Sequence, residues 1–272
     1  MNTDTQAHHK VAMAVGAHPD DIEIQMAGTL LLLKKAGYEI HYMNIANGSC
    51  GTNEYDYRTI CRMRGAEARE AAKILGAHFH PSLVNDLEIF HDLKTLRRLA
   101  AIIRDVKPSV LLTHSPADYM EDHMNTCRLV VTAAFARGMP NFRSVPARPV
   151  GTYDVTVYHS TPHGLQDSLR RRIVPGAFVN VSSVFETKLD ALRAHRSQQG
   201  WLGASQKMNS YLKTMEEITR VMGKLSGKFK LAEGWRRHLH FGFCGENEDP
   251  LRCLGKNYLV NMVYERSLKK YV

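Results

Sequence analysis

The sequence lacks the features that define several large protein classes. Its five cysteines form no CxxC pair and are odd in number, which indicates neither a cysteine-based zinc site nor a complete disulfide framework. No apolar run approaches the length of about 20 residues that a membrane-spanning helix needs, and the N-terminus lacks the apolar core of a secretory signal. Neither GxGxxG nor GxxxxGK[ST] occurs, which disfavours a nucleotide-binding oxidoreductase. We therefore expect a soluble, cytoplasmic protein.

The composition is that of an ordinary globular protein with an excess of basic residues. The 272 residues include 36 Lys+Arg against 27 Asp+Glu, for a formal net charge of +9. The basic side chains are scattered along the chain, so we expect no nucleic-acid partner, whereas a small anionic ligand remains compatible with them. We expect a single domain over residues 1–272, with a core at about 11–200 and a C-terminal elaboration at 201–272. No pattern indicates an oligomeric state.

Short apolar segments alternate with longer helical patterns along the chain. Strand patterns occupy residues 11–17, 39–46, 110–113 and 153–158. Helical patterns occupy residues 22–36, 59–75, 92–106, 184–194 and 210–225, with 225–235 interpreted as a loop. This alternation predicts an α/β fold with a mostly parallel sheet flanked by helices. Such sheets bind their ligands at the carboxyl ends of the strands.

The motif Ala-His-Pro-Asp-Asp follows the first predicted strand directly and brings an imidazole and two carboxylates to that edge. His18 and Asp21 could bind one divalent ion through nitrogen and oxygen, and zinc accepts this combination. A catalytic zinc site has about three protein ligands, and the pair Asp122-His123 beyond the third predicted strand is the candidate source of the third ligand. The sequence therefore predicts a metal centre.

Asp20, between these candidate ligands, is predicted to be the general base. A carboxylate left unligated beside the metal could accept a proton from metal-bound water during attack on a carbonyl group. The competing interpretation is structural: an aspartate at a strand-to-helix turn often caps the following helix.

Several motifs resemble the zinc-dependent de-N-acetylases of the N-acetylglucosaminyl-phosphatidylinositol deacetylase (LmbE-like) family, which includes the mycothiol and bacillithiol biosynthetic deacetylases. The matching segments are AHPDD at 17–21 with Ala27-Gly28, RGAEA at 64–68 with Leu75-Gly76, Asp86, HSPADYMEDH at 114–123, and Lys188, Ala191, His195, Ser197 and Gln198. The similarity covers roughly residues 11–200, with a weaker match at AEGWR near the C-terminus.

The resemblance implies a Rossmann-like fold and the hydrolysis of an N-acetyl group on an amino sugar, such as an N-acetylglucosamine conjugate. It implies that Asp20 is the general base, that Arg64 and Asp86 face the sugar hydroxyls, and that the zinc ligands are His18, Asp21 and His123. Iron(II) would also suit two nitrogens and one carboxylate.

The sequence departs from the family at one position of the second metal loop. Where the usual loop reads HPDH, with a first histidine that stabilises the tetrahedral oxyanion, this chain has Met120, which cannot donate a hydrogen bond. His195 is the candidate substitute. Two alternatives remain open: a zinc amidase acting on another N-acyl group, and a metal-binding carbohydrate-binding protein with weakened catalysis.

Overall fold

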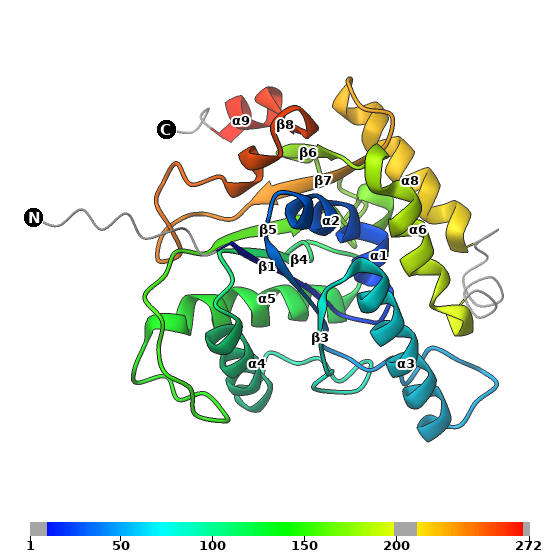
Figure 1. Ribbon diagram of the computed structural model, residues 1–272, viewed down its shortest axis with the longest axis vertical. Helices are drawn as coiled ribbons and strands as arrows, with labels where there is room; N and C mark the ends of the chain where they lie inside the picture. The colour runs from blue at the N-terminus through cyan, green and yellow to red at the C-terminus, as the bar shows by residue number, and fades with distance from the viewer. Residues whose placement is uncertain (1–9, 199–210, 269–272) are drawn as a thin grey trace, which may run out of the picture.

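The computed structural model describes residues 10–198 and 211–268, whose strands form one mixed sheet in the order β3-β2-β1-β4-β5-β7-β6-β8 (Figure 1). The strands are β1 (Val11–Gly16), β2 (Glu39–Asn44), β3 (His78–His80), β4 (Val110–Thr113), β5 (Thr156–Ser160), β6 (Ala177–Asn180), β7 (Ala232–Arg237) and β8 (Tyr258–Val260). Pairing is parallel from β3 to β5 and antiparallel from β5 to β8. The predicted α/β architecture is confirmed, with an antiparallel extension of the parallel half.

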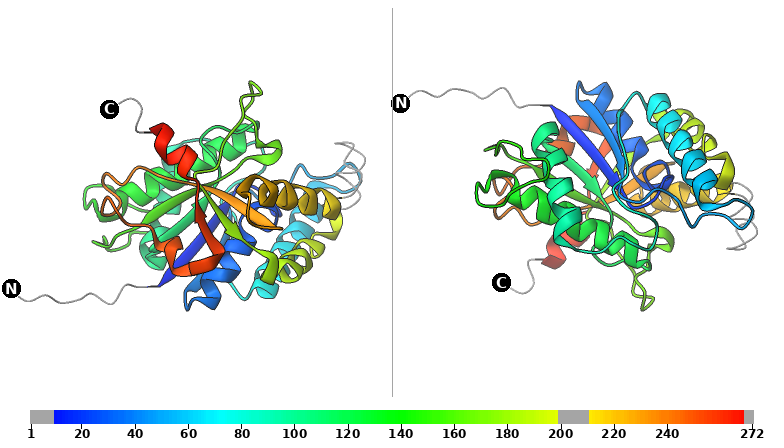
Figure 2. Two further views of the ribbon diagram at one scale, coloured as in Figure 1. Left: turned by 90° about the horizontal axis from the view of Figure 1, so that it is seen from above. Right: turned by 90° about the horizontal axis from the view of Figure 1, so that it is seen from below.

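Helices cover both faces of this sheet (Figure 2). The α-helices are α1 (Asp21–Gln25), α2 (Ala27–Lys35), α3 (Tyr57–Leu75), α4 (Leu93–Val106), α5 (Glu121–Phe135), α6 (Phe185–Arg193), α8 (Tyr211–Ser226) and α9 (Met262–Leu268). Short 3-10 turns occur at 136–138, 163–165, 182–184 and 250–257. Among the described residues, no helix combines the length and apolar character needed to cross a bilayer.

Strand β1 lies inside the sheet and is buried on both faces. Its alternate residues Ala12 and Ala14 pack into a cluster with α2, α3 and α6, while Met13 and Val15 pack into a second cluster with α4 and α5. A strand covered on both faces is expected to be apolar at every position, which explains the sequence VAMAVG. This buried strand places its carboxyl end, and the motif that follows it, at a fixed point in the fold.

The helix predicted over residues 22–36 is divided in two at Met26, whose φ of −132° departs from helical values. Helix α2 starts afresh there, and the carboxylate of Glu233 accepts hydrogen bonds from the backbone N–H groups of Gly28 (2.8 Å) and Thr29 (2.7 Å). Free N–H groups and the helix dipole make a helix start favourable for a carboxylate. The prediction of one continuous helix was wrong because this partner comes from a distant strand.

The prediction of a loop over residues 225–235 was wrong for its last residues. From Ala232 onward the chain forms β7, which lies between β5 and β6. The strand contains Glu233, whose buried side chain pairs with Lys188 from α6 at 2.5 Å. A charged residue in a short segment hides the apolar signature of a buried strand. The strand predicted at 153–158 is displaced as well, to Thr156–Ser160.

Candidate active site and metal centre

A cavity of about 270 Å³ opens at the edge of the sheet where β1, β4 and β5 end. Its walls include residues from the loops that follow these three parallel strands, where α/β sheets bind their ligands. Six of the seven predicted site residues line it: His18, Asp20, Asp21, Arg64, Asp86 and His123. The seventh, His195, does not.

The backbone at Asp20 has an unusual conformation, with φ 114° and ψ −23°. Non-glycine residues rarely adopt positive φ, and such strain costs on the order of 1–3 kcal/mol and gathers at functional sites. Although Asp20 occupies the N-cap position of α1, its side chain makes no capping hydrogen bond. The helix-capping interpretation of this aspartate therefore fails, and its carboxylate is left at the cavity wall.

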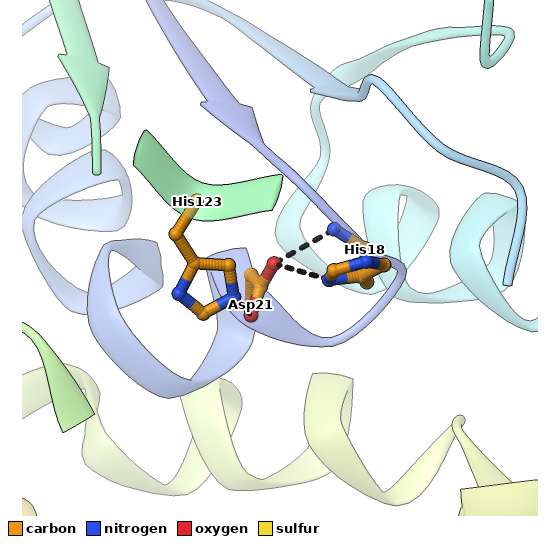
Figure 3. Close-up of side chains that lie close together, drawn as sticks. All are labelled: His18, Asp21 and His123. Carbon is orange, nitrogen blue, oxygen red and sulfur yellow. Dashed lines mark hydrogen bonds and ion pairs between the residues drawn. The ribbon is translucent and has the colours of Figure 1, made fainter. Parts of the chain in front are cut away.

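Asp21 is held rigidly by the turn in which it lies. Its Oδ2 accepts hydrogen bonds from the backbone N–H groups of Ala17 (3.1 Å) and His18 (2.7 Å). The same oxygen lies 3.5 Å from Nδ1 of His18, and Oδ1 lies 3.3 Å from Nε2 of His123. Figure 3 shows the three side chains pointing toward one another from the loop after β1 and from α1 and α5. One ligand atom from each residue lies within 4.8 Å of the others.

Each of the two imidazoles is also hydrogen-bonded to a carboxylate other than that of Asp21, through the ring nitrogen that faces away from Asp21. Nε2 of His18 is hydrogen-bonded to Asp122 at 2.9 Å, and Nδ1 of His123 is hydrogen-bonded to Asp118 at 3.1 Å. The remaining nitrogen of each ring faces Asp21. Metal-binding histidines characteristically donate their other N–H to a carboxylate, which fixes the tautomer and ring orientation. The donor set therefore fits a zinc-type ion.

The electrostatics of this cluster favour positive charge. Burial lowers the pKa of His18, but hydrogen bonds to Asp122 and Asp21 outweigh it and raise the pKa to about 9. The pKa of His123 rises to about 10 against the same burial effect, because Asp21 and Asp118 lie beside its ring. Carboxylates gathered around two imidazoles thus provide the negative charge that a bound cation would neutralise.

Asp20 has a different environment from that of Asp21. Burial raises the pKa of Asp20, and the guanidinium of Arg64, whose Nη2 lies 3.4 Å from Oδ2, opposes this rise. For Asp21, burial acts in the same direction, but the charges of His123 and His114 hold its pKa well below the usual range. Two adjacent carboxylates with pKa values moved apart are typical of a division between base and ligand.

Arg64 and Asp86 both line the cavity, from α3 and from the loop after β3. Nη2 of Arg64 donates to the carbonyl of Pro19, whereas its buried Nε and Nη1 have no hydrogen-bond partner among the described residues. The carboxylate of Asp86 accepts the backbone N–H groups of Gly48 (2.7 Å) and Cys50 (3.0 Å). Two nitrogens of Arg64 are therefore buried without a partner in this part of the chain, and Asp86 also braces the loop after β2.

His195 lies in a different place from the one expected of an oxyanion donor. It is fully buried, with Nε2 3.3 Å from Oε1 of Glu23, and it is absent from the cavity wall. A hydrogen bond from His195 to a ligand in the cavity does not fit this position. Met120 does line the cavity, so the position without a donor faces the ligand space.

Sequence reasoning missed several contributors to the site. Asp118 lies five residues before His123 in the predicted second metal loop, and this local spacing could have revealed it. Tyr119 and His163 also line the cavity, but His163 follows β5 and no sequence pattern connects it to the motif after β1. His114, which directly follows β4, is buried; its Nε2 accepts the N–H of Ala17 at 2.9 Å, and its ring stacks on that of His123 with centroids 4.1 Å apart.

Comparisons with known proteins find a matching family model and several similar chains. A family model described as PIG-L, GlcNAc-PI de-N-acetylase, matches residues 13–134. The chain is 29% identical over 237 residues to diacetylchitobiose deacetylase of Thermococcus kodakarensis, covering 84% of this chain and 82% of that protein. It is 30% identical over 205 residues to a probable N-acetyl-alpha-D-glucosaminyl L-malate deacetylase 2 of Bacillus cereus, covering 68% and 82%.

A relative of a different activity also matches. The chain is 30% identical over 202 residues to 4-oxalmesaconate hydratase of Pseudomonas putida, covering 70% of this chain and 74% of that protein. Among solved structures, 4-carboxy-2-hydroxymuconate hydratase from Pseudomonas putida superposes with a TM-score of 0.71 at 24% identity, covering 88% of this chain and 99% of that one. N,N'-diacetylchitobiose deacetylase from Pyrococcus horikoshii gives 0.69 at 24%, with 84% of each chain covered. The fold is therefore shared by deacetylases and hydratases.

Proposed function

Because the chain belongs to the GlcNAc-PI de-N-acetylase family, we propose that it is a metal-dependent hydrolase that removes the N-acetyl group from an amino-sugar conjugate. The observation that carries the proposal is the carboxylate of Asp20, which caps no helix and lies at the cavity wall next to the His18, Asp21 and His123 cluster. A free base beside three ligands is the arrangement that metal-assisted amide hydrolysis requires.

His18, Asp21 and His123 would hold the ion, which we propose to be zinc, with iron(II) as the alternative for the same donors. When bound, such an ion lowers the pKa of water to about 7 and polarises a carbonyl group. Asp118 and Asp122 would keep the two imidazoles oriented toward it.

Proton transfer is assigned to Asp20. Its carboxylate accepts a proton from the water that attacks the acetamide carbonyl, and it returns this proton to the sugar nitrogen as the C–N bond breaks. Burial, which raises the pKa of Asp20, makes the carboxylate a stronger base than an exposed aspartate. Arg64, at 3.4 Å, orients the carboxylate and keeps it charged before the reaction.

Arg64 and Asp86 are proposed to contact the sugar. The guanidinium of Arg64, which lines the cavity, would donate to ring hydroxyls or to an anionic part of a conjugate. Asp86 retains accepting capacity beyond its two backbone hydrogen bonds. The relatives named for diacetylchitobiose and N-acetylglucosaminyl malate support an amino-sugar substrate, while a zinc amidase acting on another acyl group would use the same metal centre.

A hydratase is the second candidate, and the 30% identity to 4-oxalmesaconate hydratase favours it. Addition of water to an unsaturated carboxylate could also use a base such as Asp20 and a cation such as Arg64. The guanidinium of Arg64 at the cavity wall would then bind a substrate carboxylate. Met120, which supplies no hydrogen bond to an amide oxyanion, is compatible with this activity and with a carbohydrate-binding protein of weakened catalysis.

The test is a substrate panel given to the zinc-loaded protein. N-acetylglucosamine, diacetylchitobiose and N-acetylglucosaminyl malate are assayed for acetate and free amine, and unsaturated oxo-dicarboxylates are assayed for loss of ultraviolet absorbance. Acetate release is the expected result. Hydration without acetate release would establish the second candidate, and zinc-dependent sugar binding without either reaction would establish the binding protein. Zinc content that is unchanged in both His18→Ala and His123→Ala would refute the ligand set.

A further inference from the structure

Amide hydrolysis needs a hydrogen-bond donor besides the metal. The carbonyl oxygen gains negative charge when water adds, and removing one donor to this oxygen costs about 100-fold or more in rate. Met120 lines the cavity but carries no donor, and His195 is buried away from it. The donor must therefore come from another cavity wall.

Strand order identifies that wall. β4 lies between β1 and β5, so the segment after β4, with His123 in the first turn of α5, has the motif after β1 on one side and the loop after β5 on the other. Arg64 and Asp86 come from α3 and the loop after β3, on the β2 side of β1. The loop after β5 supplies His163, which therefore lies across the cluster from the Asp20–Arg64 pair.

His163 has the chemistry of a donor. Of the three histidines that line the cavity within the described residues, His18 and His123 are hydrogen-bonded to carboxylates, whereas neither ring nitrogen of His163 has a hydrogen-bond partner in that part of the chain. Burial lowers its pKa, and the neutral ring has one N–H donor. The ring of Tyr119 packs beside it, with centroids 6.2 Å apart.

Both glutamines of the cavity wall have existing partners. The amide of Gln198 donates to the carbonyl of Gly51 at 2.9 Å, and the amide oxygen of Gln25 accepts the hydroxyl of Ser160 at 2.8 Å. Arg64 is engaged with Asp20 and with the carbonyl of Pro19. His163 thus offers an uncommitted ring nitrogen on the side opposite the base, where Tyr119, which carries a hydroxyl, is its neighbour.

We propose that His163 is a further catalytic residue, whose ring N–H donates a hydrogen bond to the acetamide oxygen as it becomes an oxyanion. This inference rests on the proposed deacetylase function. It places the base and the oxyanion donor on opposite sides of the metal ligands, so that water attacks from one side while charge is stabilised on the other.

The experiment compares wild type with His163→Ala, His163→Gln and the double variant Met120→His/His163→Ala. Loss of a transition-state donor predicts a kcat lower by about 100-fold in His163→Ala with KM nearly unchanged. Glutamine, which keeps an N–H donor, should recover part of the rate, as should a histidine at position 120. His78→Ala, on the exposed edge strand β3, is the matched control and should keep wild-type kcat.

A second readout is independent of turnover. Methylphosphonate, a tetrahedral anion, is titrated into each zinc-loaded protein by calorimetry, and His163→Ala should bind it about tenfold more weakly with zinc content unchanged. If wild type and His163→Ala release acetate equally fast, the role of His163 is overturned, and the proposed deacetylase function stands. No acetate release by wild type overturns the deacetylase, and unchanged methylphosphonate affinity in His163→Ala would then overturn the donor as well.

Discussion

Replacing Lys188 by methionine should lower the free energy of unfolding by about 3–5 kcal/mol, because it leaves a buried carboxylate without its cation. The Lys188 side chain is 0% exposed and that of Glu233 3% exposed, and the two atoms of the ion pair are 2.5 Å apart. Lys188 also donates to the carbonyl of Ile24 in α1 at 3.0 Å. The substitution therefore removes a charge pair and a hydrogen bond to the helix that carries Asp21.

The remaining bonds of Glu233 set the expected size of the effect. Its carboxylate keeps the N–H groups of Gly28 and Thr29 and the hydroxyl of Thr29, so the charge is not wholly unsatisfied. The double variant Lys188→Met/Glu233→Gln should recover part of the loss, because the unpaired charge disappears while the amide oxygen still accepts hydrogen bonds. Lys73→Met, whose lysine is 79% exposed, is the control and should change stability by less than about 0.5 kcal/mol.

Urea unfolding followed by circular dichroism measures all four proteins at pH 7. If Lys188→Met is too unstable to purify, Glu233→Gln with Lys188 retained tests the same pair from the other side. A loss below about 1 kcal/mol in Lys188→Met, equal to that of Lys73→Met, would refute the reasoning that this buried pair secures α1 and α2 to the sheet.

Three further predictions concern the site and its surroundings. Asp118→Asn should weaken zinc affinity by about 10–100-fold in a chelator competition, because His123 loses its orienting carboxylate; unchanged affinity would contradict this role. Gly48→Ala should raise KM about tenfold with zinc retained, since a Cβ at this residue, where φ is +81°, would lie 2.7 Å from Nε of Arg64; an unchanged KM would show that Arg64 does not contact substrate. Burial lowers the pKa of His159 to about 4, so its contribution to stability is complete above pH 6.5 and is lost as the pH falls toward 4. This titration can lower the free energy of unfolding by up to about 3 kcal/mol. In urea titrations, His159→Asn should therefore lose less stability than wild type between pH 7 and pH 5; equal losses would exclude His159 as a cause of the pH dependence.

The parts of the fold that could be predicted from sequence are those in which the pattern is local. The apolar run at Val11–Gly16 predicted a buried strand, and Asp92 accepts the N–H of Thr95 at the start of α4, one residue from the predicted helix boundary. Helix α3 ends at Leu75, as the helical pattern over 59–75 predicted, and Gly76 follows it with φ 66°. Each of these signals depends on neighbours within a few residues.

The features that were not predicted depend on partners far apart in sequence. The carboxylate of Glu233 accepts a hydrogen bond at the start of α2 from Gly28, 205 residues away in sequence. Its strand β7 is too short and too polar to be recognised from its pattern alone. His163 reaches the cavity only because β5 lies next to β4. The motif at 17–21 indicated a metal-centred site, but the second carboxylates and the far wall required the three-dimensional arrangement.

The most direct test of the proposed mechanism is the Asp20→Asn variant, measured for zinc content and for acetate release beside wild type on the best substrate of the panel. The amide has nearly the same shape as the carboxylate but cannot accept the proton. We predict unchanged zinc stoichiometry and a kcat lower by at least about 100-fold. A variant that retains zinc and releases acetate at the wild-type rate would contradict the assignment of Asp20 as the base.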